Sequence, residues 1–187
     1  MATHDFLQSG INNIEYANGA RVNIKSYVEM AIRTANSRAH MQGEGEKRDA
    51  WGVHTVLVPN RGGGCPYCIK FQGKVFIDDV WSSGTTEESN STGYPLLSKA
   101  VKERLFHPNC KDTIVTYFPD INSKVEPPTR EQKEEKIIRY KKEQKLNYIN
   151  RNIEKYKRLE LGSLDSENIE KYHNKRLEWQ RYKEKFE

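Results

Sequence analysis

The sequence predicts an α+β fold. A small domain over residues 1–126, clipped together by a bound metal, is built on a long N-terminal helix and short antiparallel strands, and a C-terminal helical hairpin over residues 127–187 follows it. Turn residues point to this division, because every cysteine and proline, and every glycine except Gly162, precedes residue 130. Charge points the same way, since residues 1–129 are neutral and residues 130–187 carry the whole net charge of +5.

Composition excludes several classes of protein. Only 35% of the 187 residues are apolar, and no run approaches the roughly 18 apolar residues that a membrane span needs, so an integral membrane protein is excluded. The N-terminus lacks a charged segment followed by an apolar one, which excludes a secretory signal. Three cysteines are an odd number, and without a signal a metal or catalytic use is favoured over disulfides.

The elements of the first domain follow from local signals. A helix is expected over residues 26–49, where Ser26 and Glu29 form a capping box and Gly43 and Gly45 fray the end. The turn signals Asn12-Asn13 and Asn18-Gly19 lie in the polar stretch before it. The rest is expected as a strand over 53–58, a hairpin over 69–79, a polar loop over 82–93, a short helix over 96–105 and a strand over 113–118.

The hairpin has stronger signals. Pro127-Pro128 is a stiff linker, and Thr129 with Gln132 forms a capping box that begins the first helix. Gly162 ends this helix and Asp165 caps the second. The apolar stripes are Leu146, Ile149, Ile153 and Tyr156 on the first helix and Tyr172, Trp179 and Phe186 on the second. Two helices alone bury little surface, so we expect the aromatic stripe to pack on the first domain, another copy or a partner.

The strongest chemical signal is a pair of short motifs. Cys65-Pro66-Tyr67-Cys68 is followed, after 38 intervening residues, by His107-Pro108-Asn109-Cys110. Three thiols and an imidazole in two close pairs are the donors of a closed tetrahedral zinc site. The predicted ligands are Cys65, Cys68, His107 and Cys110. All four positions are filled, so structural Zn²⁺ is favoured over a catalytic ion, and its binding would stabilise a domain with few apolar residues.

Two catalytic alternatives stay open. Cys65 or Cys68 could act as a nucleophile with His107 as its base and Asp112 or Asn109 orienting the imidazole. A His-Asn-His-type nuclease would need a histidine beside the metal, and His54 is the candidate, although a half-buried strand residue is the favoured interpretation. No catalytic residue is assigned, and a non-enzymatic role is favoured.

Several charged positions have both a functional and a structural interpretation. Arg33 and Thr34 could bind an anion or lie at the surface, and the latter is favoured. The acidic pairs Asp78-Asp79 and Glu87-Glu88 could hold a hard cation, although solvated loop charges are the usual outcome. The loop 61–64 lacks the features of a phosphate-binding loop. The basic hairpin could contact DNA, but its interleaved acids favour a solvated surface.

Several stretches together resemble the tailed-phage minor capsid protein 2 family, which is related to the wider phage head morphogenesis proteins. The resemblance covers about residues 21–121 and the hairpin. It rests on Arg21–Asn36, Arg61-Gly-Gly-Gly-Cys-Pro-Tyr-Cys68, Gly73-Lys-Val-Phe-Ile-Asp-Asp79, Tyr94-Pro-Leu-Leu97, Leu105-Phe-His-Pro-Asn-Cys-Lys-Asp112, Tyr148-Ile-x-Arg151 and Tyr156-Lys-Arg158. Members usually have a long N-terminal region, and here about 20 residues precede the match, as in a domain, a split gene or a prophage remnant.

This resemblance implies a phage or prophage minor capsid protein, present in few copies near the portal and acting in head assembly or DNA packaging. It implies that Cys65, Cys68, His107 and Cys110 are the family's Cys/His cluster. The expected partners are other head proteins (portal or capsid) or a host protein, with DNA as a further candidate, in the host bacterial cytoplasm and the virion or procapsid. The alternative is a phage-borne effector enzyme, such as an ADP-ribosyltransferase-like or nuclease toxin.

Overall fold

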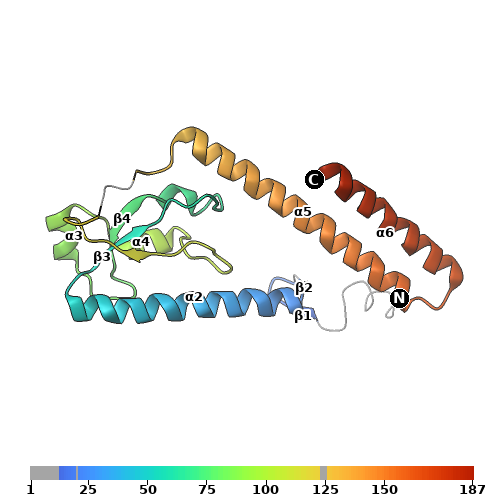
Figure 1. The fold of residues 1–187 in the computed structure, drawn as a ribbon. Coiled ribbons are helices and arrows are strands. Elements are labelled where there is room, and N and C mark those ends of the chain that lie inside the picture. The colour runs from blue at the N-terminus through green and yellow to red at the C-terminus, as the bar shows by residue number, and fades with distance from the viewer. Residues whose placement is uncertain (1–12, 20, 123–125) are drawn as a thin grey trace. The chain divides into compact units, whose positions relative to one another are not determined.

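Long helices and short antiparallel strands make up the chain, which confirms the predicted α+β class (Figure 1). The structure is a computed structural model, and it describes residues 13–19, 21–122 and 126–187. The chain divides into two compact units: one is Met30–Tyr140, and the other combines the segment up to Glu29 with Lys141–Glu187. The predicted boundary between residues 126 and 127 stays a prediction about independent folding.

A three-stranded antiparallel sheet organises the first unit, with strand order β4-β3-β5. The central strand β3 (Thr55–Val58) lies within the strand predicted at 53–58, and β5 (Val115–Thr116) lies within 113–118. β4 (Lys74–Ile77) pairs with β3 so that Thr55 faces Ile77. All four β3 residues are buried, as expected for a strand covered on both faces.

The hairpin predicted over residues 69–79 is wrong. Ile69–Phe71 form a short 3₁₀ helix, η1, and the strand that follows pairs with β3. The turn-like Gln72-Gly73 pair misled the prediction. Gly73 does have a positive φ of 72°, but its N–H donates to the carbonyl of Val58, 2.7 Å away, and so begins the β3–β4 pairing.

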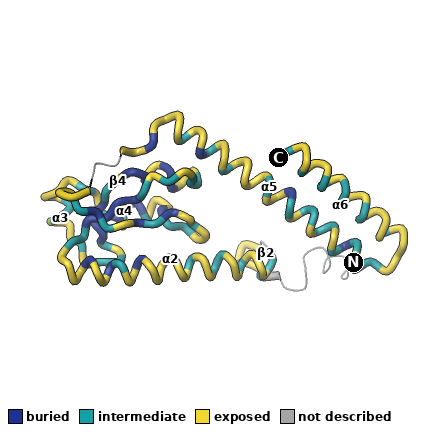
Figure 2. The backbone as a smooth tube through the Cα atoms, in the orientation of Figure 1, coloured by how far each residue is buried: buried dark blue, intermediate teal, exposed yellow. Residues whose placement is uncertain are grey.

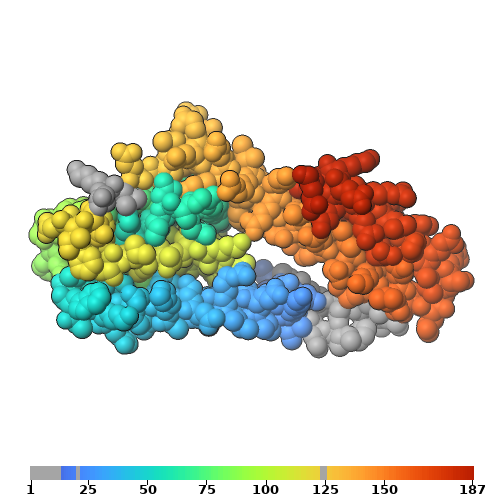
Figure 3. Space-filling model, viewed as in Figure 1, coloured from blue at the N-terminus to red at the C-terminus, as the bar shows by residue number. Residues whose placement is uncertain are grey.

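Helix α2 (Ile24–Trp51) begins and ends two residues outside the predicted range. The residue before the helix, Asn23, caps it: its side chain accepts a hydrogen bond from the backbone N–H of Lys25 at 2.9 Å. The predicted Ser26 cap is therefore wrong, because Ser26 lies inside the helix. Gly43 and Gly45 do not fray the helix. Gly45 is buried with Met41 and Arg48 on the face that contacts the rest of the first unit. Figure 3 shows the outward face of α2, toward its cyan end, open to solvent.

The segment predicted as a polar loop over 82–93 contains helix α3 (Thr86–Thr92). Thr85 and Glu88 form a reciprocal capping box that begins it, and Gly93, with a φ of 75°, ends it. A capping box satisfies two backbone donors of the first turn, which lets a seven-residue polar helix form. The short helix predicted over 96–105 is confirmed as α4 (Leu97–Lys102).

The hydrophobic core of the first unit is small and surrounds the sheet, where Figure 2 shows the buried residues gathered around β3, β4 and α4. It includes Met41, Val56, Val58, Cys68, Phe71, Phe76, Leu97, Ala100, Leu105 and Ile114. Cys65 and Cys110 are partly buried and pack against it. The cysteine-bearing segments therefore form part of the core.

The predicted helical hairpin is present, and all of it from Lys141 onward belongs to the second unit. Helix α5 (Arg130–Gly162) begins after the Thr129–Gln132 capping box, and α6 (Ser166–Phe186) begins at Asp165, whose side chain accepts from the backbone N–H of Glu167. Tyr148 contacts Trp179 and Tyr156 contacts Tyr172, with ring centroids 5.7 and 6.4 Å apart. The partners advance in opposite directions along the two helices, so the helices are antiparallel.

These ring contacts correct one expectation. The aromatic stripe of α6 packs on α5 rather than only on a separate surface, because Tyr172 and Trp179 face aromatic rings of α5. The stripe is incompletely covered, since no described residue of α6 is fully buried.

A small antiparallel ladder of β1 (Asn13–Glu15) and β2 (Arg21–Asn23) lies before α2, with its turn at the predicted Asn18-Gly19 pair. The turn signal at Asn12-Asn13 falls partly outside the described residues. None of the helices in the described ranges is long and apolar enough to cross a membrane.

Candidate metal centre

The first cysteine pair lies on a tight turn between β3 and β4. The backbone N–H groups of Cys68 and Ile69 both donate to the carbonyl of Cys65 at 3.1 Å, and Cys68 begins η1. Gly64 precedes this turn, and a Cβ there would lie 2.7 Å from the Gln72 amide nitrogen. The absence of a side chain at Gly64 lets the turn approach Gln72, so both cysteines are held against the core.

The second pair lies on a turn of the same kind, after α4. The backbone N–H of Cys110 donates to the carbonyl of His107 at 2.9 Å, as that of Cys68 does to Cys65. Asn109, between the two, has a φ of 64°. Asparagine tolerates this left-handed conformation better than most residues, which explains its place in the turn. The repeated hydrogen-bond pattern presents the side chains of residues 107 and 110 to one side.

The two turns bring the four predicted ligands together as two contacting pairs. Cys65 Sγ lies 3.1 Å from His107 Nε2, and Cys68 Sγ lies 3.4 Å from Cys110 Sγ. The ligand atoms of Cys65, Cys68 and His107 lie within 4.8 Å of one another. Zn–S bonds of about 2.3 Å and Zn–N bonds of about 2.0–2.1 Å put neighbouring tetrahedral ligands roughly 3.5–3.8 Å apart. The separations across each pair are close to that range, so the cluster could hold a metal.

Asp112 is a fifth group at the cluster, which the sequence suggests only as a residue that could orient the imidazole. Its ligand atom forms a second group with those of Cys68 and Cys110, again within 4.8 Å. Its backbone N–H donates to Cys110 Sγ at 3.4 Å, and its Oδ2 lies 3.7 Å from the same sulfur. The feature of the sequence that could have indicated Asp112 as part of the cluster is its position two residues after Cys110.

The imidazole of His107 is oriented for use of its Nε2 atom. Its Nδ1 lies 2.8 Å from the carbonyl oxygen of Pro108. A carbonyl can only accept, so Nδ1 carries the proton and the Nε2 lone pair faces Cys65. This is the arrangement that metal-bound histidines commonly have. The nucleophile interpretation needs Asp112 or Asn109 to orient this ring, and the carbonyl of Pro108 holds that position instead.

The thiols of Cys68 and Cys110 share a hydrogen bond. It raises the pKa of Cys68, which burial raises further, and lowers the pKa of Cys110. Of these two cysteines, Cys110 is therefore the easier to deprotonate. All three cysteines are free of disulfides, which leaves their sulfurs available as ligands.

Arg33 and Thr34 hold the second turn in place. The hydroxyl of Thr34 accepts from the backbone N–H of Asn109 at 3.1 Å and donates to the carbonyl of Met30. The guanidinium of Arg33 donates to the side-chain oxygen of Asn109. Arg33 is exposed, in agreement with the favoured surface interpretation, and Thr34 is half-buried. Both residues anchor the His107–Cys110 turn to α2.

A buried polar network supports the cluster on its other side. The amide of Gln72 donates to the carbonyl of Gly63 at 2.9 Å and to Asp112 Oδ1 at 2.7 Å. Arg61 donates to the same carboxylate at 2.9 Å. Gln72 and Asp112 are 0% and 3% exposed, so their polar atoms need partners, and these bonds connect the loop before Cys65 to the segment after Cys110.

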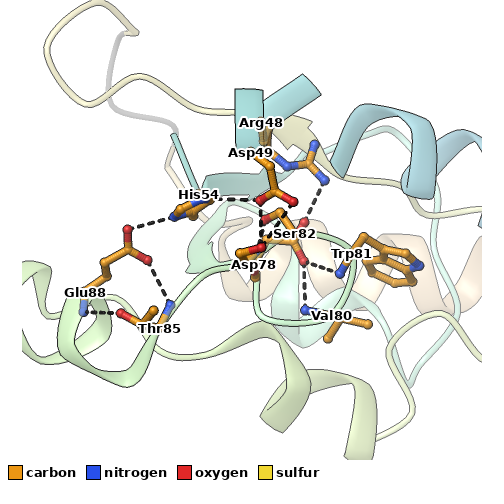
Figure 4. Close-up of polar contacts among 10 residues, drawn as sticks. Arg48, Asp49, His54, Asp78, Val80, Trp81, Ser82, Thr85 and Glu88 are labelled. Carbon is orange, nitrogen blue, oxygen red and sulfur yellow. Dashed lines mark hydrogen bonds and ion pairs between the residues drawn. The ribbon is translucent and has the colours of Figure 1, made fainter. Parts of the chain in front are cut away.

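The first acidic pair is held inside the first unit, whereas Glu87 of the second pair is exposed, as expected of a loop charge. Asp78 is 0% exposed and accepts from Arg48, which is 1% exposed, at 2.6 Å. The other oxygen of Asp78 accepts from the backbone N–H groups of Val80 and Trp81 (Figure 4). Asp79 accepts from the backbone N–H of Ser98 at 2.8 Å, at the start of α4. The expectation of solvated loop charges is therefore wrong for Asp78.

His54 lies near the Arg48–Asp78 pair, among other charged side chains (Figure 4). Its Nδ1 lies 2.7 Å from Glu88 and its Nε2 lies 3.4 Å from Asp49 (Figure 4). Glu88 also caps α3. His54 is the residue directly before β3, so its contact with Glu88 links α3 to this strand. Its side chain is 15% exposed, in agreement with the half-buried interpretation, and both its nitrogens face carboxylates rather than the cysteines.

Comparison with known proteins agrees with the resemblance seen in the sequence. No curated protein and no solved structure matches the chain. One family model does match, and its match runs over residues 1–186, which is essentially the whole chain and includes both cysteine pairs and the hairpin. The chain belongs to the Phage minor capsid protein 2 family.

Proposed function

We propose that this protein is a minor structural component of a phage head, acting through protein–protein contacts in head assembly or DNA packaging. Family membership over residues 1–186 carries the proposal. It supports association with the virion or procapsid and with other phage proteins. The architecture suits such a role, because a small internally braced unit and a long helical hairpin offer extended surfaces for neighbouring proteins.

Within this role, Cys65, Cys68, His107 and Cys110 hold one structural Zn²⁺. Three soft thiolates and one imidazole suit zinc, and four protein ligands leave no position for a substrate. The ion would join two turns that lie about 40 residues apart in sequence, in a unit whose core is small. Asp112 then acts as a supporting group, because its Oδ1 is committed to Arg61 and Gln72.

The tip of the hairpin is the proposed contact surface for another head protein. Leu161 is 77% exposed at the end of α5, and Leu164 is fully exposed in the loop before α6. The two leucines lie three positions apart, and neither is covered within the hairpin. Together they offer apolar surface that a partner could bury.

Co-purification tests the role. The full chain, tagged and co-expressed with the portal and major capsid proteins of a phage that encodes it, should retain at least one of them. The variant Leu161→Ser/Leu164→Ser should lose that partner. Ile121→Ser is the matched control, because Ile121 is an 80% exposed aliphatic residue of the other unit, and it should retain the partner.

Two results would contradict the proposal. In the first, neither head protein is retained by the unaltered chain. In the second, expression of the chain alone arrests growth of the bacterial host, and a single polar substitution that leaves the fold intact abolishes the arrest. The second result would favour the effector enzyme.

A further inference from the structure

A cavity beside the cysteine-bearing loop has no role in the proposed metal site or in the proposed contact surface at the hairpin tip. It has a volume of about 310 Å³ and lies between residues 60–62 and the first turns of α5, all within the Met30–Tyr140 unit. Three cationic side chains line it, Arg61, Lys136 and Arg139, together with one acidic side chain, Glu135. Cavities of about 300 Å³ and above are typical of small-ligand sites.

Lys136 forms the buried part of this cavity. It is 8% exposed, and its ammonium group donates to the side-chain oxygens of Asn60 at 2.6 Å and Gln72 at 2.7 Å. An ammonium group has three donors, so these two bonds leave one for a ligand. Burying a lysine is costly, and its two neutral acceptors leave its charge uncompensated by direct contact.

The two arginines come from different segments of the lining, Arg61 from the loop and Arg139 from α5. Arg61 donates through Nε to Asp112, and Arg139 donates through Nη1 to the carbonyl of Gly62 at 2.9 Å. A guanidinium has five donors, so each arginine is oriented by one bond and keeps further N–H groups. Even counting Glu135 and Asp112 against the three cations, one positive charge is in excess.

The lining also restricts the ligand. Each lining residue is polar or a glycine, so no aromatic ring is available to stack on a base, and the functional groups that line the cavity are polar. Convergent guanidinium and ammonium donors around a small polar space suit a tetrahedral oxyanion with several acceptor oxygens.

We propose that this cavity binds a phosphate group, held by Arg61, Lys136 and Arg139. The phosphate could belong to a nucleic-acid backbone or be free in solution, and the contacts are the same in both cases. The proposal is independent of the head-assembly role and of the metal. It does not use the glycines of the 61–64 loop as a phosphate-binding loop, because two of the three cations come from α5, more than 70 residues later in the chain.

Two binding measurements on the purified full-length chain test it. Inorganic phosphate is titrated while the backbone amide of Gly62 is followed by NMR, and a short duplex DNA is titrated by fluorescence anisotropy at several salt concentrations. Sodium acetate is the comparison anion. Binding of phosphate and DNA would assign the site to a nucleic-acid backbone, and binding of phosphate alone would assign it to the free anion. Either result supports the proposal.

Two variants of the lining should change binding in opposite directions, and a third variant outside it is the control. Arg139→Gln should weaken phosphate binding by about tenfold, the loss expected for one charge-assisted hydrogen bond. Glu135→Gln removes the only acid in the lining and should tighten binding by at least about twofold. Lys141→Gln is the matched control: it removes one charge from an exposed position of α5, two residues beyond Arg139 and outside the lining, and binding should stay unchanged.

Thermal unfolding checks that all three variants keep the stability of the parent chain. The proposal is overturned if neither probe binds. It is also overturned if Arg139→Gln and Glu135→Gln bind like Lys141→Gln, or if acetate binds as tightly as phosphate, which would indicate a site for acidic side chains instead.

Discussion

Replacement of Gly45 by alanine tests the packing of α2 on the first unit. A Cβ at Gly45 would lie 1.8 Å from the carbonyl oxygen of Trp81 and 2.5 Å from its carbonyl carbon. Ordinary contact begins at 3.4 Å, so helix and loop would have to separate by about 1.6 Å, far more than a packed interior absorbs without cost. The clashing atoms are backbone, which cannot rotate away as a side chain can.

The loop cannot recede cheaply, because the backbone N–H of Trp81 donates to Asp78 at 3.0 Å and Asp78 is paired with Arg48 on the same helix. Overpacking costs typically about 1–3 kcal/mol, and breaking a buried ion pair costs about 3–5 kcal/mol. Against this, alanine gains about 1 kcal/mol in helix propensity over glycine. The two costs are alternatives, because a loop that recedes relieves the overpacking. Breaking the pair, less the propensity gain, lowers the free energy of unfolding of Gly45→Ala by about 2–4 kcal/mol.

Gly43 is the matched control. It lies two residues earlier on the same helix, and a methyl group added there would meet no atom within 4 Å, so Gly43→Ala should gain about 0.5–1 kcal/mol. Urea unfolding of the full chain, followed by tryptophan fluorescence and circular dichroism, gives both values. If both variants are equally stable, α2 does not pack on the Trp81 loop as described.

Three other perturbations probe separate parts of the molecule. Asp78→Ala leaves Arg48 buried without its carboxylate, so denaturant unfolding should show a loss of about 3–5 kcal/mol; a loss below about 1 kcal/mol would refute the buried pair. Hydrogen bonds from Arg176 and then His173 lower the pKa of Glu160 to about 2, so its contribution to hairpin stability is complete above its ordinary pKa of about 4.5 and fades as the pH falls toward 2. The melting temperature of Glu160→Gln should therefore lie below that of the parent chain at pH 6 and converge with it near pH 2; a gap that is independent of pH would contradict this linkage. Thr34→Val removes the acceptor of the Asn109 N–H and should weaken zinc binding about 10-fold in a chelator competition, whereas Thr34→Ser keeps the hydroxyl and should not; equal affinities would remove Thr34 from the support of the second turn.

The parts of the fold that sequence predicts well are those set by local signals. The capping box of Thr129 and Gln132 and the cap at Asp165 act within three residues, and the structure has both. The capping box of Thr85 and Glu88 is equally local, but the polar helix that it begins has no apolar periodicity, so the pattern favours a loop there.

Other features depend on contacts between distant residues. In the sequence, Gly45 looks like a helix end. A glycine is needed there because the backbone of Trp81, 36 positions away, leaves no space for a Cβ. The strand after Gly73 looks like part of a local hairpin because its true partner, β3, is not visible from turn residues.

The candidate metal site shows the same limit. Residue type and spacing are enough to select Cys65, Cys68, His107 and Cys110, and the structure brings them together in pairs. The supporting groups Thr34, Gln72 and Asp112 are missed by sequence patterns or given other roles. Their hydrogen bonds join segments tens of residues apart in the sequence. The residues next to each of them in the sequence do not indicate which distant group it contacts.

Elemental analysis of the purified full-length chain tests the central claim, a structural zinc, most directly. We expect about one zinc per chain, lost together with cooperative unfolding in Cys68→Ser and in Cys110→Ser, and a cobalt-substituted protein with the absorption of a tetrahedral site containing thiolates. A metal-free chain that is fully folded and as stable as the metal-loaded one would contradict it.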